Sequence, residues 1–157
     1  MSSFRISEHL KHSLQSNTAA LLKWLLLSVF IGLIVGLIGV SFHLLLDYVT
    51  DLRKTYPWLL LFMPLAGIII VALYHFSDMD DDTGTESVIT SVRSGSLVKL
   101  RMAPLIYIST ILTHLTGGSA GREGAALQLG GSISSAVGQW LKLDDRDQRV
   151  ITMCGMA

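Results

Sequence analysis

Residues 24–46 read WLLLSVFIGLIVGLIGVSFHLLL and contain no Lys, Arg, Asp or Glu. A helix needs roughly 20 predominantly apolar residues to cross the hydrocarbon core of a bilayer, and this run is longer than that. A second run, residues 56–74 (YPWLLLFMPLAGIIIVALY), is also long enough, and its prolines predict a kink or a late helix start. Because half of the 157 residues are hydrophobic and gather in such runs, the sequence predicts an all-α, polytopic membrane protein.

The segment before the first run has a different pattern. Within FRISEHLKHSLQS, residues 4–16, Ile6, Leu10 and Leu14 recur every four residues. This spacing fits an amphipathic helix in the membrane interface, although a polar tail is an equally good interpretation.

The placement of Lys and Arg predicts the orientation. Three of them precede the first run, two lie between the runs, and three follow the second run within residues 93–101. Positive residues are enriched on the cytoplasmic side, so the amino terminus is expected in the cytoplasm and the chain in the cell (inner) membrane. We expect residues 1–22 to form a cytoplasmic or interfacial segment and residues 23–157 a membrane domain. That domain is expected to be incomplete at its carboxy end, because residues 150–157 resemble the opening of a further apolar helix.

Shorter, broken helices are predicted after the second run. Residues 83–95 (TGTESVITSVRSG) form a short helix that Gly95 ends, and residues 102–116 form an apolar helix whose polar side chains require it to face protein. A further helix is predicted over residues 125–141. Its small residues at four-residue spacing permit close helix packing; they are Ala126, Gly130, Ser134 and Gly138.

The segment expected to carry the chemistry is GGSAGREGAALQLGG, residues 117–131. Its glycines leave backbone N–H groups uncovered, and a helix begins directly after them. The start of a helix presents unpaired N–H donors and a partial positive charge, which together favour an anion. One helix end contributes too little to hold a dehydrated ion. The segment therefore predicts an anion site at which several helix ends converge, the helix of residues 83–95 being the second contributor.

Glu123 is the residue most indicative of function in this segment. A carboxylate inside a membrane is costly and is a functional hypothesis by default. When charged, it would occupy the anion site itself, and when protonated it would leave, which couples proton and anion movement. The alternative is a capping carboxylate paired with Arg122, and for Arg122 itself local pairing is the favoured interpretation.

Two other classes of function fit parts of the sequence. Ser119 lies in a G-x-S-x-G pattern, and with His114 or a later histidine as base it would fit a rhomboid-type intramembrane serine protease. A non-transporting membrane fragment is a third interpretation. No cluster with metal-site spacing and no cofactor motif is present in the sequence, and the net charge of zero argues against a nucleic-acid partner.

The same segment resembles the CLC family of chloride channels and proton-coupled anion antiporters. The family pattern G-[KR]-E-G-P, followed by a glutamine and paired glycines, is matched apart from its proline, which Ala125 replaces. The family's earlier motif, G-S-G-I-P, corresponds to residues 82–86, and its anion-binding serine would be Thr83. A fluoride-transporting branch of the family also departs at this motif. The matching residues are Gly121, Arg122, Glu123, Gly124, Gln128, Gly130 and Gly131.

The resemblance implies anion transport rather than enzymatic activity. The transported ions would be chloride or fluoride, by channel or by exchange for protons, with Glu123 as the gate. Family members are homodimers in the bilayer, built from inverted helical halves, so a homodimer is expected of the full-length protein. The implied anion-binding residues are Thr83, Gly84, Gly121, Arg122, Gly124, Ala125 and Ala126.

Overall fold

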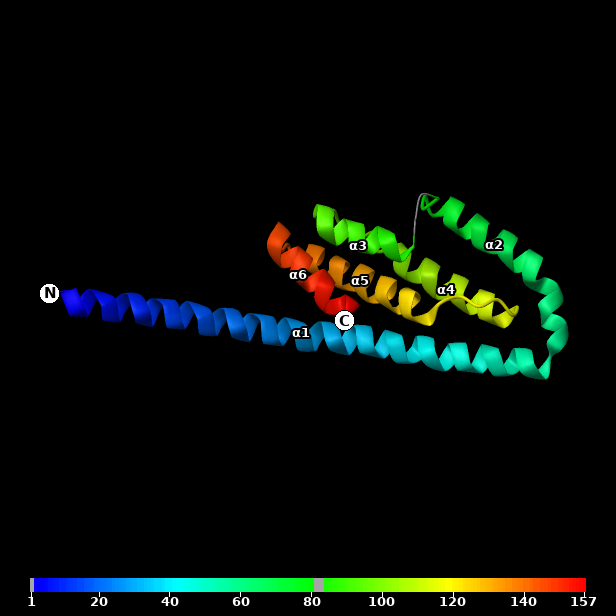
Figure 1. Ribbon diagram of the computed structural model, residues 1–157, viewed down its shortest axis with the longest axis horizontal. Coiled ribbons are helices and arrows are strands. Elements are labelled where there is room, and N and C mark those ends of the chain that lie inside the picture. Colours follow the sequence, from blue (N-terminus) through cyan, green and yellow to red (C-terminus); the bar gives the residue numbers. More distant parts are fainter. Residues whose placement is uncertain (1, 81–83) are drawn as a thin grey trace.

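The computed structural model describes the backbone of residues 2–80 and 84–157, and the side chains of residues 18, 20–80 and 84–157. Every regular element in this part of the chain is helical (Figure 1), so the all-α prediction is confirmed. The elements are α1 (Ser2–Thr55), the 3-10 helix η1 (Pro57–Phe62), α2 (Met63–Phe76), α3 (Thr85–Ser94), α4 (Met102–Leu115), α5 (Arg122–Trp140) and α6 (Asp145–Met156).

The long helix α1 runs beside the rest of the molecule, and α4, α5 and α6 all contact it. It continues without a break past residue 22, so the backbone alone marks no boundary between an interfacial segment and the first span. Two stretches are long and apolar enough to cross a membrane by length and composition, Ala20–Thr55 and Pro57–Phe76. Most of their side chains are exposed in the structure, as expected of helices that face lipid or other membrane segments.

The second span is divided in two by its prolines, as the sequence predicts. Pro57 opens η1, and Pro64 lies in the first turn of α2, where a missing N–H removes no helical hydrogen bond. The chain turns back through η1, so that α2 lies on the opposite side of α4 from α1 (Figure 1).

The short helices end where expected, but two of them begin earlier. Gly95 ends α3 in the left-handed conformation, with φ 76°. The start of α5 was predicted at Ala125 and lies at Arg122, because only Gly121 is extended and the residues after it are already helical. The start of α6 was predicted near Val150 and lies at Asp145, because Asp144 caps it by accepting from the Asp147 N–H over 3.2 Å.

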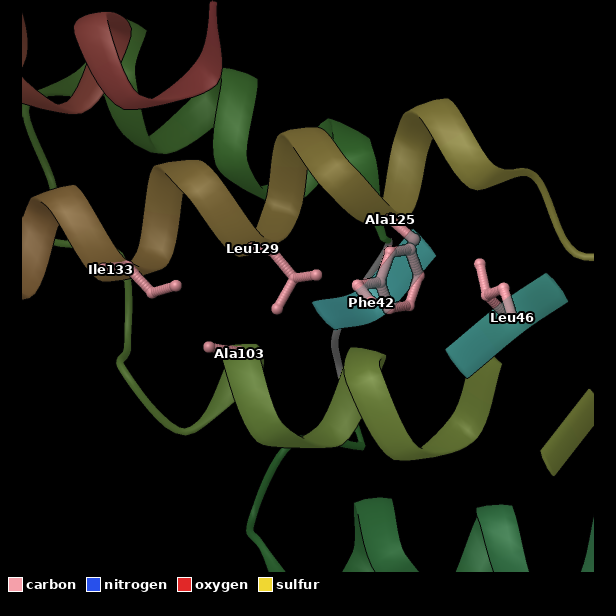
Figure 2. Close-up of a cluster of buried hydrophobic side chains, with 6 residues drawn as sticks. All are labelled: Phe42, Leu46, Ala103, Ala125, Leu129 and Ile133. Atoms are coloured by element: carbon pink, nitrogen blue, oxygen red, sulfur yellow. The ribbon is translucent and has the colours of Figure 1, made fainter. Parts of the chain in front are cut away.

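The packed centre lies around α5. The side chains of a hydrophobic cluster join α5 to α1 and α4 (Figure 2): Phe42, Leu46, Ala103, Ala125, Leu129 and Ile133. On another side of α5, α6 packs against the small residues, as their four-residue spacing predicted. A Cβ added at Gly130 would strike the Gly155 carbonyl oxygen, and one added at Gly138 would strike Gln148. Ala126 is exposed and takes no part in this contact.

Candidate functional site

The first turns of α3 and α5 meet, although 37 residues separate their starting points in the sequence. Gln128 Nε2 donates to Thr85 Oγ1 over 3.2 Å. A Cβ added at Gly124 would lie 2.8 Å from the same Oγ1, so the close approach requires glycine there. The residues preceding both helices are glycines, Gly84 and Gly121, and neither has a side chain to cap its helix. Two of the helix starts that the sequence analysis expected to converge therefore do so.

The residues predicted to bind an anion occupy different surroundings within this region. Gly121 is open, because a Cβ there would meet nothing within 4 Å. Ala125 is buried in the hydrophobic cluster, whereas Ala126 is exposed. Thr83 lies outside the described residues. The structure thus brings Gly84 together with the start of α5, while anion binding at any of these residues stays a prediction.

Glu123 lies in the first turn of α5 and lines a pocket of about 300 Å³ between α5 and α1. The α1 side of the pocket is mostly apolar, and α5 contributes both charges. The lining residues are Val35, Gly39, Phe42, His43, Arg122, Glu123, Ala126, Leu129 and Ile133. Glu123 is exposed and forms no hydrogen bond or ion pair with any residue that the structure describes. Its carboxylate is therefore held in place by none of them.

Arg122 forms an ion pair with a residue of α1 and not with the neighbouring Glu123 carboxylate. Its Nη1 lies 3.1 Å from Asp47 Oδ1, and the other oxygen of Asp47 lies 3.3 Å from His43 Nε2. Arg122 is therefore paired with a residue 75 positions earlier in the chain, and no ion pair joins it to Glu123 among the described residues. Sequence spacing gave no sign of Asp47 and His43 as members of this region, since only the fold brings them to α5.

The same ion pair places the start of α5 at some depth within the molecule. α1 continues for eight residues beyond Asp47, to Thr55, which at 1.5 Å per residue is about 12 Å. The end of α4 extends past the start of α5, and the α4–α5 connection runs back to that start (Figure 1). The first turn of α5 therefore starts inside the length of the bundle, as the broken-helix interpretation requires.

Ser119 and His114 do not form a catalytic pair. Ser119 is exposed in the connection before α5, and His114 Nδ1 lies 2.9 Å from the Thr110 carbonyl oxygen of its own helix. No hydrogen bond joins the two side chains among those the structure describes, which leaves the serine without its proposed base. The rhomboid-type interpretation finds no support in this arrangement.

Comparison with known proteins agrees with the fold and the position of the motif. The family model described as voltage gated chloride channel matches residues 66–157. The chloride/fluoride channel protein of Pseudomonas syringae pv. tomato (strain ATCC BAA-871 / DC3000) is 36% identical over 136 residues, which is 86% of this chain and 30% of that protein. A crystal structure of a CLC-type fluoride/proton antiporter matches with a TM-score of 0.76 and 34% identity, over 83% of this chain and 33% of the other.

These findings define the class first: a helical membrane protein with the fold of a CLC antiporter. More particularly, the chain belongs to the voltage gated chloride channel family. None of the comparisons connects it to a rhomboid-type protease, so that alternative is set aside. The chain spans about a third of the length of the relatives it matches.

Proposed function

We propose that the complete gene product carrying this chain moves anions across a membrane, through a path that begins where the first turns of α3 and α5 meet. The single observation that carries the proposal is that meeting, in which the Gln128 amide joins the α3 start at Thr85. Two helix starts at one place, each preceded by a glycine, supply partial positive charge there. The names of both relatives, a chloride/fluoride channel and a fluoride/proton antiporter, support the same activity.

The proposed anion is chloride or fluoride, and two observations favour fluoride as the first to test. Both relatives are named for fluoride. In addition, residues 82–86 keep little of the G-S-G-I-P motif, and a fluoride-transporting branch departs at the same place. Thr83 would take the position of the motif's serine, and Gly84, Gly121, Gly124, Ala125 and Ala126 would contribute through their backbone.

Energetics limit how much this chain supplies alone. A helix end contributes about 0.3–2 kcal/mol toward a negative charge, whereas the effective cost of dehydrating a small ion is several kcal/mol. The two helix starts described here therefore need further donors, water or other parts of the protein. The Arg122 side chain is bound to Asp47, so Arg122 would serve mainly through its backbone N–H and by holding α5 against α1.

Glu123 is the proposed gate. Its carboxylate has no partner in the described part of the chain and borders an open pocket, so it can change position without breaking an existing bond. When charged it would compete with the anion for the amides of the α5 start, and when protonated it would leave them. This exchange of one negative group for another is what would couple proton movement to anion movement.

The surroundings of the protein follow from the same proposal. The amino terminus would be cytoplasmic, with Lys23 near that side, and Asp47 would lie 24 residues further along α1, about 36 Å away. Glu123, beside Asp47, would then open toward the outer side of a cell (inner) membrane. The partners would be chloride or fluoride, protons, lipid and a second copy of the full-length protein, with no catalysis of a chemical reaction.

The test is anion efflux from liposomes containing the complete gene product, measured with chloride and fluoride electrodes while a pH electrode follows proton movement. Glu123→Gln is expected to keep anion flux and lose proton movement. Asp51→Asn is the matched control. This exposed α1 carboxylate lies 2.8 Å from the Lys54 ammonium and does not line the pocket. Proton coupling that survives in Glu123→Gln would refute the gate. Absence of flux for both anions from folded protein would refute transport.

A further inference from the structure

Gln128 lies in the second turn of α5, faces the first residue of α3 and is buried, with 4% of its surface exposed. One end of its amide is satisfied, since Nε2 donates to Thr85 Oγ1. The other end is not, because Oε1 is covered and has no partner among the described residues. Buried polar atoms in native proteins almost always have a partner, either protein or ordered water. The free oxygen therefore marks a position for a hydrogen-bond donor from elsewhere.

Two glycines lie close to the hydrogen bond between Gln128 and Thr85. A Cβ added at Gly84 would lie 3.6 Å from Gln128 Nε2, and one added at Gly124 would lie 2.8 Å from Thr85 Oγ1. The Gln128 and Thr85 side chains thus occupy the gap where the two helices start. A Cβ at Gly124 would push the Thr85 hydroxyl away, which links the position of the hydroxyl to the close approach of the helices.

Thr85 falls at the isoleucine position of the G-S-G-I-P motif when that motif is laid over residues 82–86. An isoleucine has no hydroxyl and would give the Gln128 amide nothing to bind. The hydrogen bond between the helices therefore depends on the residue at which this chain departs from the motif.

We propose that Gln128 is a positioning residue of the anion path. Its Nε2 holds the first turn of α3 against α5 through Thr85. Its Oε1, which is covered in this structure, accepts from a water that enters together with the anion. A water has two O–H groups, so one can bind Oε1 while the other binds the negative ion. In this way a carbonyl oxygen, which by itself would repel an anion, contributes to holding it. This inference rests on the proposed anion transport.

The experiment measures fluoride and chloride flux against concentration in liposomes with the complete gene product. Gln128→Leu and Thr85→Val each remove the hydrogen bond between the helices. Thr85→Val is expected to raise the concentration for half-maximal flux about fivefold, the factor typical of one lost hydrogen bond. Gln128→Leu, which also removes the Oε1 acceptor, is expected to raise it by more, and both variants retain maximal flux. The double variant is expected to show about the same factor as Gln128→Leu alone, because that variant already removes the hydrogen bond that Thr85→Val removes.

Two further variants separate positioning from general damage to the fold. Thr85→Ser keeps the hydroxyl and is expected to restore the wild-type concentration dependence. Gln139→Leu makes the same substitution as Gln128→Leu at an exposed position toward the other end of α5, and is expected to change nothing. A loss of maximal flux with unchanged half-saturation would indicate structural damage and would overturn the positioning role.

The outcomes distinguish this inference from the proposed function. If the unsubstituted protein transports the anion and the half-saturation concentration is unchanged in Thr85→Val and Gln128→Leu, the role of Gln128 is overturned and the proposed transport is not. Single effects that multiply in the double variant would overturn the shared hydrogen bond. Absence of flux from the unsubstituted protein would overturn both.

Discussion

Replacing Gly130 by alanine is expected to weaken the contact between α5 and α6. The new Cβ would strike the Gly155 carbonyl oxygen, which is backbone and cannot rotate away, so the two helices must separate. A gap of about 1 Å forfeits a quarter to a half of the attraction between facing atoms. Overpacking of this kind costs about 1–3 kcal/mol, while alanine in place of glycine returns about 0.5–1 kcal/mol of helix propensity. The net expectation is a loss of about 0–2.5 kcal/mol in the free energy of unfolding, and a loss of about 1–3 kcal/mol relative to an alanine that gains the propensity without the clash.

The measurement is denaturant unfolding of the complete gene product in detergent micelles, followed by tryptophan fluorescence, since Trp140 ends α5. Gly67→Ala is the matched control, because a Cβ there would meet nothing within 4 Å. It is expected to leave stability unchanged or to raise it slightly. If Gly130→Ala is as stable as Gly67→Ala, the backbone contact between α5 and α6 does not limit stability and the reasoning is wrong.

Three further substitutions test separate contacts. Asp144→Ala removes the side-chain cap of α6 at the Asp147 N–H and is expected to cost about 1 kcal/mol in the same unfolding assay. Lys23→Gln breaks a pair with Asp147 whose lysine is about half exposed, so its cost should stay below about 1 kcal/mol and shrink further in high salt. Asp47→Asn releases the Arg122 guanidinium beside the Glu123 pocket. The substitution should lower the anion concentration for half-maximal flux at low ionic strength. An unchanged concentration at low ionic strength would contradict the pairing.

The parts of the fold that hydropathy governs could be predicted from the sequence. The two apolar runs became the two candidate spans, the prolines divided the second one, and Gly95 ended α3. The predicted helix starts were less accurate, because the first turns are polar and lack the apolar pattern that indicates a helix. Glu123 appeared to lie in a glycine-rich connection and is helical, and the last helix was expected near Val150 and begins at Asp145.

The partners at the site could be predicted only in part, since most of them come from distant segments. The motif marked Gln128 by its place in a pattern, and nothing in that pattern indicated Thr85 as its partner. Asp47 lies just beyond the first apolar run, where its charge is expected for a residue near a membrane surface. Its contact with Arg122 depends on how α5 lies along α1, which no periodicity reports.

The composition of α5 has a consequence for the way the chain enters a membrane during synthesis. Among the described residues, only α1 and the η1–α2 stretch are apolar and long enough to partition into lipid alone. α5 buries serines, glycines and Gln128 in its middle, against α6 and α3, and such a surface gains little from lipid contact. Biogenesis should therefore be sequential: the two apolar segments integrate first, and α5 leaves the translocon only once neighbouring helices are present to cover it. Crosslinking of α5 to the translocon should thus persist until α6 has been synthesised.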